Sequence, residues 1–121
     1  GVDIVVVAVD DLELQKEIYA ECQSRKIPCN CVDEINRCDF IFPSTIKKGD
    51  VVIAISSSGK VPGFSVSLKD YINTFLPENI EEKMNEIMEL RKSLPAGKDR
   101  MLKIKEESAK YFSHILSGIR K

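Results

Sequence analysis

The residue best suited to proton-transfer chemistry is Asp33, which follows a short apolar segment at residues 29–32. A carboxylate at the end of a strand projects from the edge of an α/β sheet, where such proteins bind ligands. Beside a bound cofactor it can take a proton. A structural interpretation stays open, because Asp after a strand is also a common turn former or helix cap. Glu34 and Asp39 are the neighbouring acids, and we expect both to be solvated.

A second polar group, Ser-Ser-Ser-Gly-Lys at residues 56–60, joins an apolar segment to a predicted helix. Backbone N–H groups and hydroxyls at a helix entrance can hold a carboxylate or a phosphate. The segment lacks the Gly-Lys-Ser/Thr ending of a nucleotide-hydrolysing loop. A capped loop without a ligand is the alternative, and the residues alone leave both interpretations open.

Four cysteines, Cys22, Cys29, Cys31 and Cys38, cluster in the first third of the chain. This clustering does not suit a disulfide framework, so we expect reduced thiols. Cys29 and Cys31 stand two apart on a predicted strand and therefore share one face. Their spacing matches no zinc ribbon or finger, which favours buried small side chains over a metal site. The single histidine, His114, lacks companions for metal or triad chemistry.

The elements that position these residues follow from the apolar patterns. Residues 2–9 are rich in β-branched side chains and predict a parallel strand covered on both faces. Asp10 or Asp11 caps the following helix, Asp10 with the spacing of a capping box to Glu13, and the helix ends near Lys26. Residues 29–32 form the next strand, which completes one strand-helix-strand unit.

The rest of the chain predicts a hairpin and three helices. Residues 40–42 and 50–55 flank a Lys-Lys-Gly-Asp turn signal and form a hairpin-like pair. A helix from Pro62 ends at Leu76-Pro77, and Leu94-Pro95-Ala96-Gly97 separates the last two helices. The apolar stripes are Phe64, Leu68, Tyr71, Ile72 and Phe75 on the first helix, Ile80, Met84, Ile87 and Met88 on the second, and Met101, Leu102, Phe112, Ile115 and Leu116 on the third.

One chain has too little apolar surface around the last two helices and the hairpin to bury them fully. We therefore expect a second copy to cover them, with a monomer and a small satellite core as the alternative. With 18 basic and 19 acidic side chains the net charge is −1, which gives no bulk basicity for nucleic acid. No apolar run approaches the ~20 residues that span a bilayer and no signal peptide pattern is present, so we expect no membrane partner and a cytoplasmic location.

Three motifs together carry a resemblance to a known family. They are Val-Val-Val-Ala-Val-Asp-Asp at residues 5–11, N-x-V-D followed by F-x-x-P-S within residues 30–44, and an apolar strand ending in Ser-Ser-x-Gly within residues 51–62. In this order they resemble the siroheme synthase family of precorrin-2 dehydrogenases, some of which are also sirohydrochlorin ferrochelatases. The resemblance covers most of the chain.

The resemblance implies an α/β fold class: the C-terminal half of a Rossmann-type parallel sheet (residues 1–42), a dimerisation hairpin region (43–74) and a small helical domain (75–121). A family member would begin with a strand and a Gly-rich turn that cradles the dinucleotide pyrophosphate. This sequence contains no such turn, and its first apolar segment resembles the fourth strand of that domain. We therefore expect that the first half of the Rossmann unit is not included.

The resemblance also implies an activity, the NAD-dependent oxidation of precorrin-2 to sirohydrochlorin, with Asp33 as the key carboxylate. Insertion of Fe²⁺ at the same carboxylate would be a second activity. NAD contacts fall on Ala8, Val9 and Asp10, where Val9 replaces a Thr that is frequent in the family and so loses a hydroxyl. Contacts to the tetrapyrrole fall on Asn30, Ser57, Ser58 and Lys60. The resemblance also implies a homodimer, in which two copies interlock through the region of the hairpin.

Two functional hypotheses follow. The first is the enzyme just described, in which the cofactor carries the hydride chemistry and the protein supplies position and charge. The second is a non-catalytic fragment that dimerises and binds a tetrapyrrole without the phosphate-binding turn. Titration with NAD separates them, because micromolar binding favours the enzyme and no binding favours the fragment.

Overall fold

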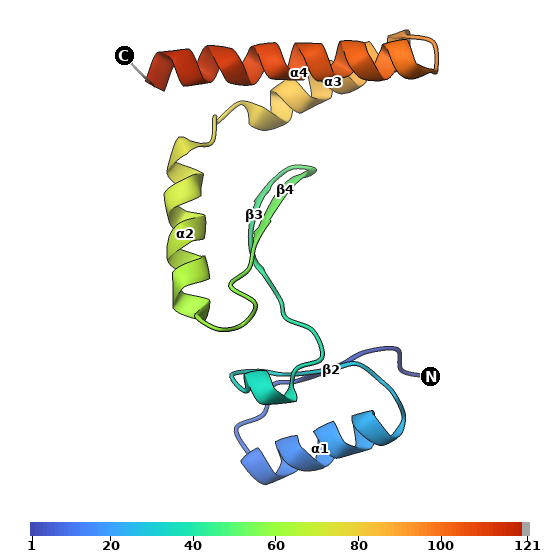
Figure 1. Ribbon diagram of the computed structural model, residues 1–121, viewed down its shortest axis with the longest axis vertical. Coiled ribbons are helices and arrows are strands. Elements are labelled where there is room, and N and C mark those ends of the chain that lie inside the picture. Colours follow the sequence, from blue (N-terminus) through green and yellow to red (C-terminus); the bar gives the residue numbers. More distant parts are fainter. Residues whose placement is uncertain (120–121) are drawn as a thin grey trace. The chain divides into compact units, whose positions relative to one another are not determined.

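The computed structural model describes residues 1–119, which form two compact units. Of the described residues, one unit contains residues 1–45 and 54–70, and the other contains residues 46–53 and 71–119. In chain order the elements are β1 (Val5–Val7), α1 (Leu12–Ser24), β2 (Cys29–Cys31), the 3-10 turn η1 (Ile35–Arg37), β3 (Ser44–Lys48), β4 (Val51–Ile55), α2 (Pro62–Phe75), α3 (Ile80–Ser93) and α4 (Lys98–Ile119) (Figure 1). The predicted α/β class is confirmed.

The strand-helix-strand unit is present as expected. β1 and β2 pair in parallel, with Val5 opposite Cys29 and Val7 opposite Cys31. α1 lies along one face of this pair (Figure 1), and Cys22 from the helix packs with Val7 and the two strand cysteines. The expected strand over residues 2–9 covered on both faces is wrong: β1 has three residues, and Val6 is 46% exposed because none of the described elements packs over its side chain.

Asp11, and not Asp10, caps α1. Its Oδ1 accepts hydrogen bonds from the backbone N–H groups of Glu13 and Leu14 at 3.0 and 3.1 Å. The extended conformation of Asp11 turns its side chain back over the first turn, as a cap requires. At the other end Lys26 adopts a left-handed conformation with φ +56°, and the helix ends close to the predicted position.

The hairpin is formed by β3 and β4, which are joined by two residues. Gly49 in the connection has φ +59°, a conformation that costs glycine little. The prediction that residues 40–42 form the first strand is wrong, because a two-residue connection makes the partner of β4 end at Lys48. Pro43 stands immediately before β3 and has no N–H group to contribute to the ladder.

The three predicted helices are confirmed. α3 and α4 run side by side (Figure 1), with Ile80 buried at the start of α3. The Tyr111 hydroxyl donates a hydrogen bond to Asn79 Oδ1 at 3.0 Å, and the ammonium of Lys83 lies 5.9 Å from the centre of the Tyr111 ring. Val51 and the two helices enclose a small apolar depression of about 170 Å³. None of the helices within residues 1–119 has the length and hydrophobicity needed to cross a membrane.

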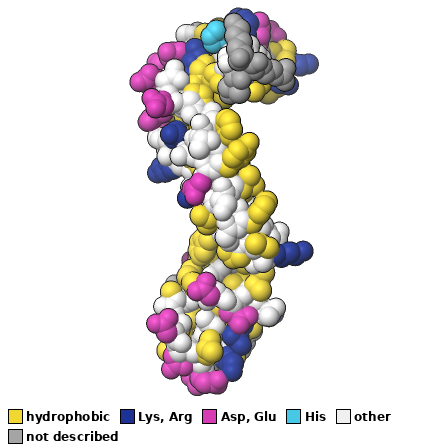
Figure 2. Space-filling model, turned by 90° about the vertical axis from the view of Figure 1, so that its left-hand side faces the viewer, with side chains coloured by type: hydrophobic (Ala, Val, Ile, Leu, Met, Phe, Trp, Pro, Cys, Tyr) yellow, Lys and Arg dark blue, Asp and Glu magenta, His cyan; other side chains and the backbone are white. Residues whose placement is uncertain are grey.

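Large apolar side chains remain exposed along α2. Phe64, Tyr71 and Phe75 are 62%, 63% and 48% exposed, and their spacing places them on one face of the helix. Figure 2 shows hydrophobic side chains on the surface of the face that is on the left in Figure 1, where α2 is drawn. The domain boundaries at residues 42 and 74 stay a prediction, and the final two residues of the 75–121 domain lie outside the described residues.

Candidate functional site

The carboxyl ends of β1 and β2 bring two predicted site segments to one edge of the sheet. The backbone N–H of Val32 donates to the carbonyl of Val7 at 2.9 Å, so the chain leaves both strands at the same level. Ala8, Val9 and Asp10 follow β1 as an exposed loop, and Asp33 follows β2. Ligands of parallel α/β sheets bind at this edge.

Asp33 sits in an unusual backbone conformation. Its φ is +65°, in the left-handed region that few residues other than glycine adopt, although Asp tolerates it better than most. The N–H of Glu34 donates to the carbonyl of Cys31 at 3.1 Å and closes the turn. The side chain of Asp33 is exposed, so its carboxylate is open to a ligand.

Asp33 lines a depression of about 370 Å³ formed by two segments that are far apart in the sequence. One is the end of β2 with the following turn, and the other is the loop before α2. The lining residues are Asn30, Cys31, Val32, Asp33, Glu34, Ile35, Cys38, Ile41, Phe42, Gly59 and Pro62. A carboxylate is thus presented beside apolar side chains, an arrangement suited to a large, partly apolar ligand.

Asn30 lies in this lining but has a structural hydrogen bond. Its side chain is 6% exposed, and its Nδ2 donates to the carbonyl of Phe40 at 2.8 Å. Asn30 also forms an isolated antiparallel bridge with Cys38. The residue therefore ties the segment after η1 to β2, which shapes the wall of the depression.

The loop before α2 is held by its own serines. Ser57 Oγ accepts a hydrogen bond from the N–H of Val61 at 3.2 Å, and the N–H of Lys60 donates to the carbonyl of Ser57 at 3.1 Å. Ser58 and Gly59 follow one another with φ +56° and +72°. Such contacts are typical of a capped loop, which is one of the two interpretations that the sequence left open for residues 56–60.

Ser57 lines a second depression of about 120 Å³ that adjoins the first. The two share Ile41, Phe42, Gly59 and Pro62. Ser58 and Lys60 are exposed and are not among the residues lining either depression. The structure thus brings together Asn30, Asp33 and Ser57, while the roles of all the predicted contact residues stay predictions.

Three of the four cysteines, Cys22, Cys29 and Cys31, are buried beneath the site, as the sequence predicted, while Cys38 is only half-buried. The Sγ atoms of Cys29 and Cys31 are 4.0 Å apart on one face of β2, and Cys22 packs against them. Burial raises the pKa of the Cys29 thiol from 9.0 to about 12 and also raises the pKa of Cys31. Within residues 1–119 no three His, Cys, Asp or Glu side chains are grouped to hold a metal ion.

Several residues that support the site were not found by sequence reasoning. Asp39 Oδ2 accepts hydrogen bonds from the Cys29 N–H at 2.8 Å and from Gln23 at 2.9 Å, although the residue is exposed as expected. Gln15 is buried on the inner face of α1, a position that sequence reasoning did not single out. A signal was present, because Gln15 has helical spacing to Ile18 and Cys22, whereas Leu14 is 41% exposed.

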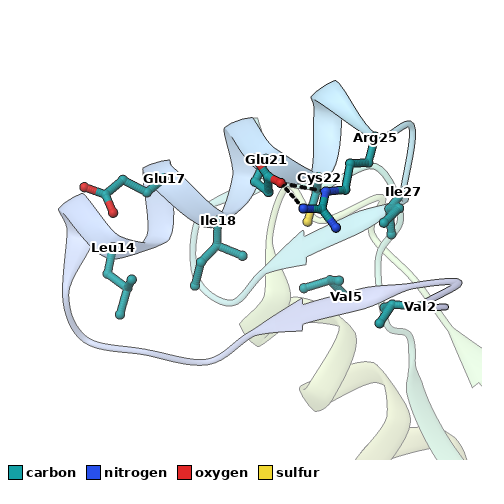
Figure 3. A pocket seen from close by; sticks show the side chains of 9 residues that line it. All are labelled: Val2, Val5, Leu14, Glu17, Ile18, Glu21, Cys22, Arg25 and Ile27. Atoms are coloured by element: carbon teal, nitrogen blue, oxygen red, sulfur yellow. Dashed lines mark hydrogen bonds and ion pairs between the residues drawn. The ribbon is translucent and has the colours of Figure 1, made fainter.

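A larger depression of about 500 Å³ lies away from Asp33, between α1 and β1. Figure 3 shows Leu14 and Ile18 pointing from the helix toward Val5 and Val2. Glu21 and Arg25 form an ion pair at its rim. This groove is mostly aliphatic and contains none of the predicted site residues.

Comparisons with known proteins show what the chain is similar to. Residues 1–44 match a family described as "Putative NAD(P)-binding". A siroheme synthase of Zymomonas mobilis is 32% identical over 121 residues, which include 95% of this chain and 26% of the relative. Siroheme synthase 1 of Serratia proteamaculans is 38% identical over 77 residues, covering 64% of this chain and 16% of the relative. The chain belongs to the siroheme synthase family.

The matched relatives are much longer than this chain. A third relative, a siroheme synthase of Photorhabdus laumondii, is 36% identical over 80 residues, covering 66% of this chain and 17% of the relative. The chain thus spans about a sixth to a quarter of the length of these relatives. The match of residues 1–44 supports a nicotinamide cofactor for the part of this family member that contains β1, α1 and β2.

Proposed function

We propose that this chain serves siroheme biosynthesis, within an enzyme that oxidises precorrin-2 to sirohydrochlorin with NAD. The observation that carries the proposal is the position of Asp33, which stands at the carboxyl end of β2 and lines a depression shared with the loop before α2. Similarity to siroheme synthases and to an NAD(P)-binding family supports the substrate and the cofactor.

The reaction removes a hydride and a proton from the substrate. NAD, when bound, supplies the acceptor for the hydride. Ala8, Val9 and Asp10 fit the place of that cofactor, because they form an exposed loop at the end of the strand beside Asp33. The carboxylate of Asp33 accepts the proton, a role for which its exposure at the rim of the depression suits it.

Binding of the tetrapyrrole falls on the loop before α2 and on Asn30. Ser57, Ser58 and Lys60 supply hydroxyls and an ammonium for the carboxylates of precorrin-2. Asn30 lines the wall of the depression that contains Asp33, although its amide nitrogen is engaged with the carbonyl of Phe40. Insertion of Fe²⁺ into sirohydrochlorin is a second activity for this site, with Asp33 taking protons from the ring nitrogens.

The proposal is tested with Asp33→Asn in the full-length protein. Oxidation of precorrin-2, followed by the absorbance of NADH, should fall by about 10²- to 10⁴-fold, the contribution of a positioned proton acceptor. Asp3→Asn removes an exposed carboxylate from the same unit and should leave turnover unchanged. Near-normal turnover of Asp33→Asn would show that the assignment is wrong.

A second role, the assembly of two copies, is favoured by the exposed stripe of Phe64, Tyr71 and Phe75 on α2. Contiguous exposed apolar side chains mark interfaces more often than free surface. A chain that dimerises and binds a tetrapyrrole but shows no affinity for NAD in a titration would support the non-catalytic alternative.

A further inference from the structure

A pair of polar residues, Gln15 and Arg37, lies behind the turn that carries Asp33. Gln15 is 3% exposed, one of only a few polar residues among residues 1–119 that are buried, and it stands on the apolar face of α1. A buried amide lowers stability unless its hydrogen bonds are made. Its partners therefore indicate why a polar side chain occupies this place.

Both polar atoms of the Gln15 amide form hydrogen bonds with residues close to Asp33. Its Nε2 donates to the carbonyl of Val32 at 3.4 Å, and its Oε1 accepts from Arg37 Nη1 at 3.1 Å. Arg37 Nη1 is also 3.7 Å from Glu34 Oε2. The residues immediately before and after Asp33 are thus connected to the same two side chains.

We infer that Gln15 and Arg37 are positioning residues that hold the turn at Asp33 so that its carboxylate faces the depression. The inference rests on the proposed function, in which Asp33 accepts the proton. Gln15 restrains the backbone before Asp33 through its hydrogen bond to the Val32 carbonyl. Arg37 restrains the side chain of Glu34, the residue after Asp33, through an ion pair.

The backbone of Asp33 needs such restraint. A left-handed conformation costs energy for a residue with a Cβ atom and persists only where the surrounding structure imposes it. The N–H of Glu34 closes the turn on the carbonyl of Cys31, and the Cys38 thiol donates to the carbonyls of Cys31 and Glu34 at 3.2 and 3.3 Å, but none of these contacts holds the Val32 carbonyl that directly precedes Asp33. Without the Gln15–Arg37 pair the turn can relax, and a displacement of about 1 Å at a catalytic group can cost about 10²-fold in rate.

The test uses Gln15→Met in the full-length protein, because Met matches the length of Gln and makes neither hydrogen bond. The turnover number per folded active site should fall at least about tenfold, while KM for NAD stays within about twofold. Gln23→Met is the matched control, since Gln23 lies on the same helix and loses a hydrogen bond to Asp39 instead. A purely structural role of Gln15 would lower the unfolding midpoint without lowering turnover per folded site, which would overturn the inference.

Gln15→Glu covers the case in which Gln15→Met does not fold. The carboxylate keeps an acceptor for Arg37 but has no donor for the Val32 carbonyl, so turnover should fall while folding is retained. In combination with Asp33→Asn, either substitution at Gln15 should cause no further loss of rate, because residues that act through one another are not additive. Additive losses would overturn the inference.

A crystal structure of the folded Gln15 variant separates this inference from the proposed function. A shift of the Asp33 backbone out of the left-handed region supports the positioning role even if Asp33→Asn turns out to retain turnover, in which case only the proposed function fails. An unchanged Asp33 turn overturns the positioning role, whatever the activity of Asp33→Asn.

Discussion

Gly59 lies against Ile35, so close that a Cβ atom on Gly59 would come within 2.7 Å of Ile35 Cδ1. The same atom would be 2.9 Å from Ile41 Cδ1. This contact joins the loop before α2 to the turn after β2, and both residues line walls of the depression that contains Asp33. The absence of a side chain at Gly59 therefore sets the width of the site.

The first prediction is that Gly59→Ala destabilises the protein by about 1–2 kcal/mol, because φ is +72° and an L-residue is strained there. Rotation of the two isoleucines relieves part of the close contact. Denaturation in urea measures the change. Gly63→Ala is the control, since Gly63 lies in α2 with open space around it and alanine favours a helix. Equal stability of the two variants would contradict the prediction.

A second prediction separates stability from activity at Asp33. Asp33→Gly should raise the free energy of unfolding by up to about 1 kcal/mol, because glycine adopts the left-handed conformation without strain. It should also abolish oxidation of precorrin-2. Lys26→Gly, at φ +56° after α1, should give a similar gain in stability with unchanged turnover. Thermal unfolding and the NADH assay measure the two effects, and a loss of stability in Asp33→Gly would argue against strain at this turn.

A third prediction concerns alkaline pH. Burial raises the pKa of Cys29 from 9.0 to about 12, so above pH 9 the unfolded chain releases a proton that the folded chain retains. Stability from this group is complete below pH 9 and is lost as the pH rises toward 12. Between pH 8 and 10.5 the loss is about 2 kcal/mol.

Urea unfolding under reducing conditions tests this dependence. Cys29→Ala should be less stable at pH 8 but should lose less of its stability between pH 8 and 10.5 than the unmodified chain does. Groups that do not contact Cys29 contribute equally to both proteins, whereas the thiol of Cys31 interacts with Cys29 and responds to its removal. An identical fall in both would show that Cys29 does not carry the effect.

A fourth prediction is that the protein forms a homodimer that covers the apolar face of α2. Tyr71→Asp should weaken the dimer by several kcal/mol, because an unpaired carboxylate would be buried at the interface in both copies. Asn73→Asp is the control, since residue 73 lies on the opposite face of the helix from Phe64. Analytical ultracentrifugation at tens of micromolar measures the assembly, and a monomeric unmodified chain would exclude it.

Substitutions on α3 are less suited to this test. Met84 and Ile87 are half-buried and line the small depression between α3, α4 and Val51. A carboxylate at either position would disturb the packing of one chain before it affected a second copy. Only exposed apolar side chains, such as Tyr71 on α2, are therefore suitable positions for substitutions that test dimerisation.

The order and type of the helices and strands could be predicted from the amino-acid sequence, because they depend on local patterns. The β-branched segment before Ala8, the Pro at the start of α2 and the Leu-Pro-Ala-Gly break before α4 each act within a few residues. The family resemblance came from motifs of the same short range. Alternation along a strand placed Cys29 and Cys31 on one face, and the lack of a zinc-site spacing favoured buried side chains over a metal site.

The residues that surround Asp33 could not be predicted in this way, because they come together through packing between distant segments. The approach of Gly59 to Ile35, the burial of Gln15 and the link from Arg37 to Gln15 join residues distant in sequence, and no local pattern specifies which partners meet. The strand partner of β4 also depended on the number of residues in the turn rather than on apolar content. Hydrogen bonds and close contacts between separate elements form only once the chain has packed, so their geometry belongs to the fold and not to any one segment.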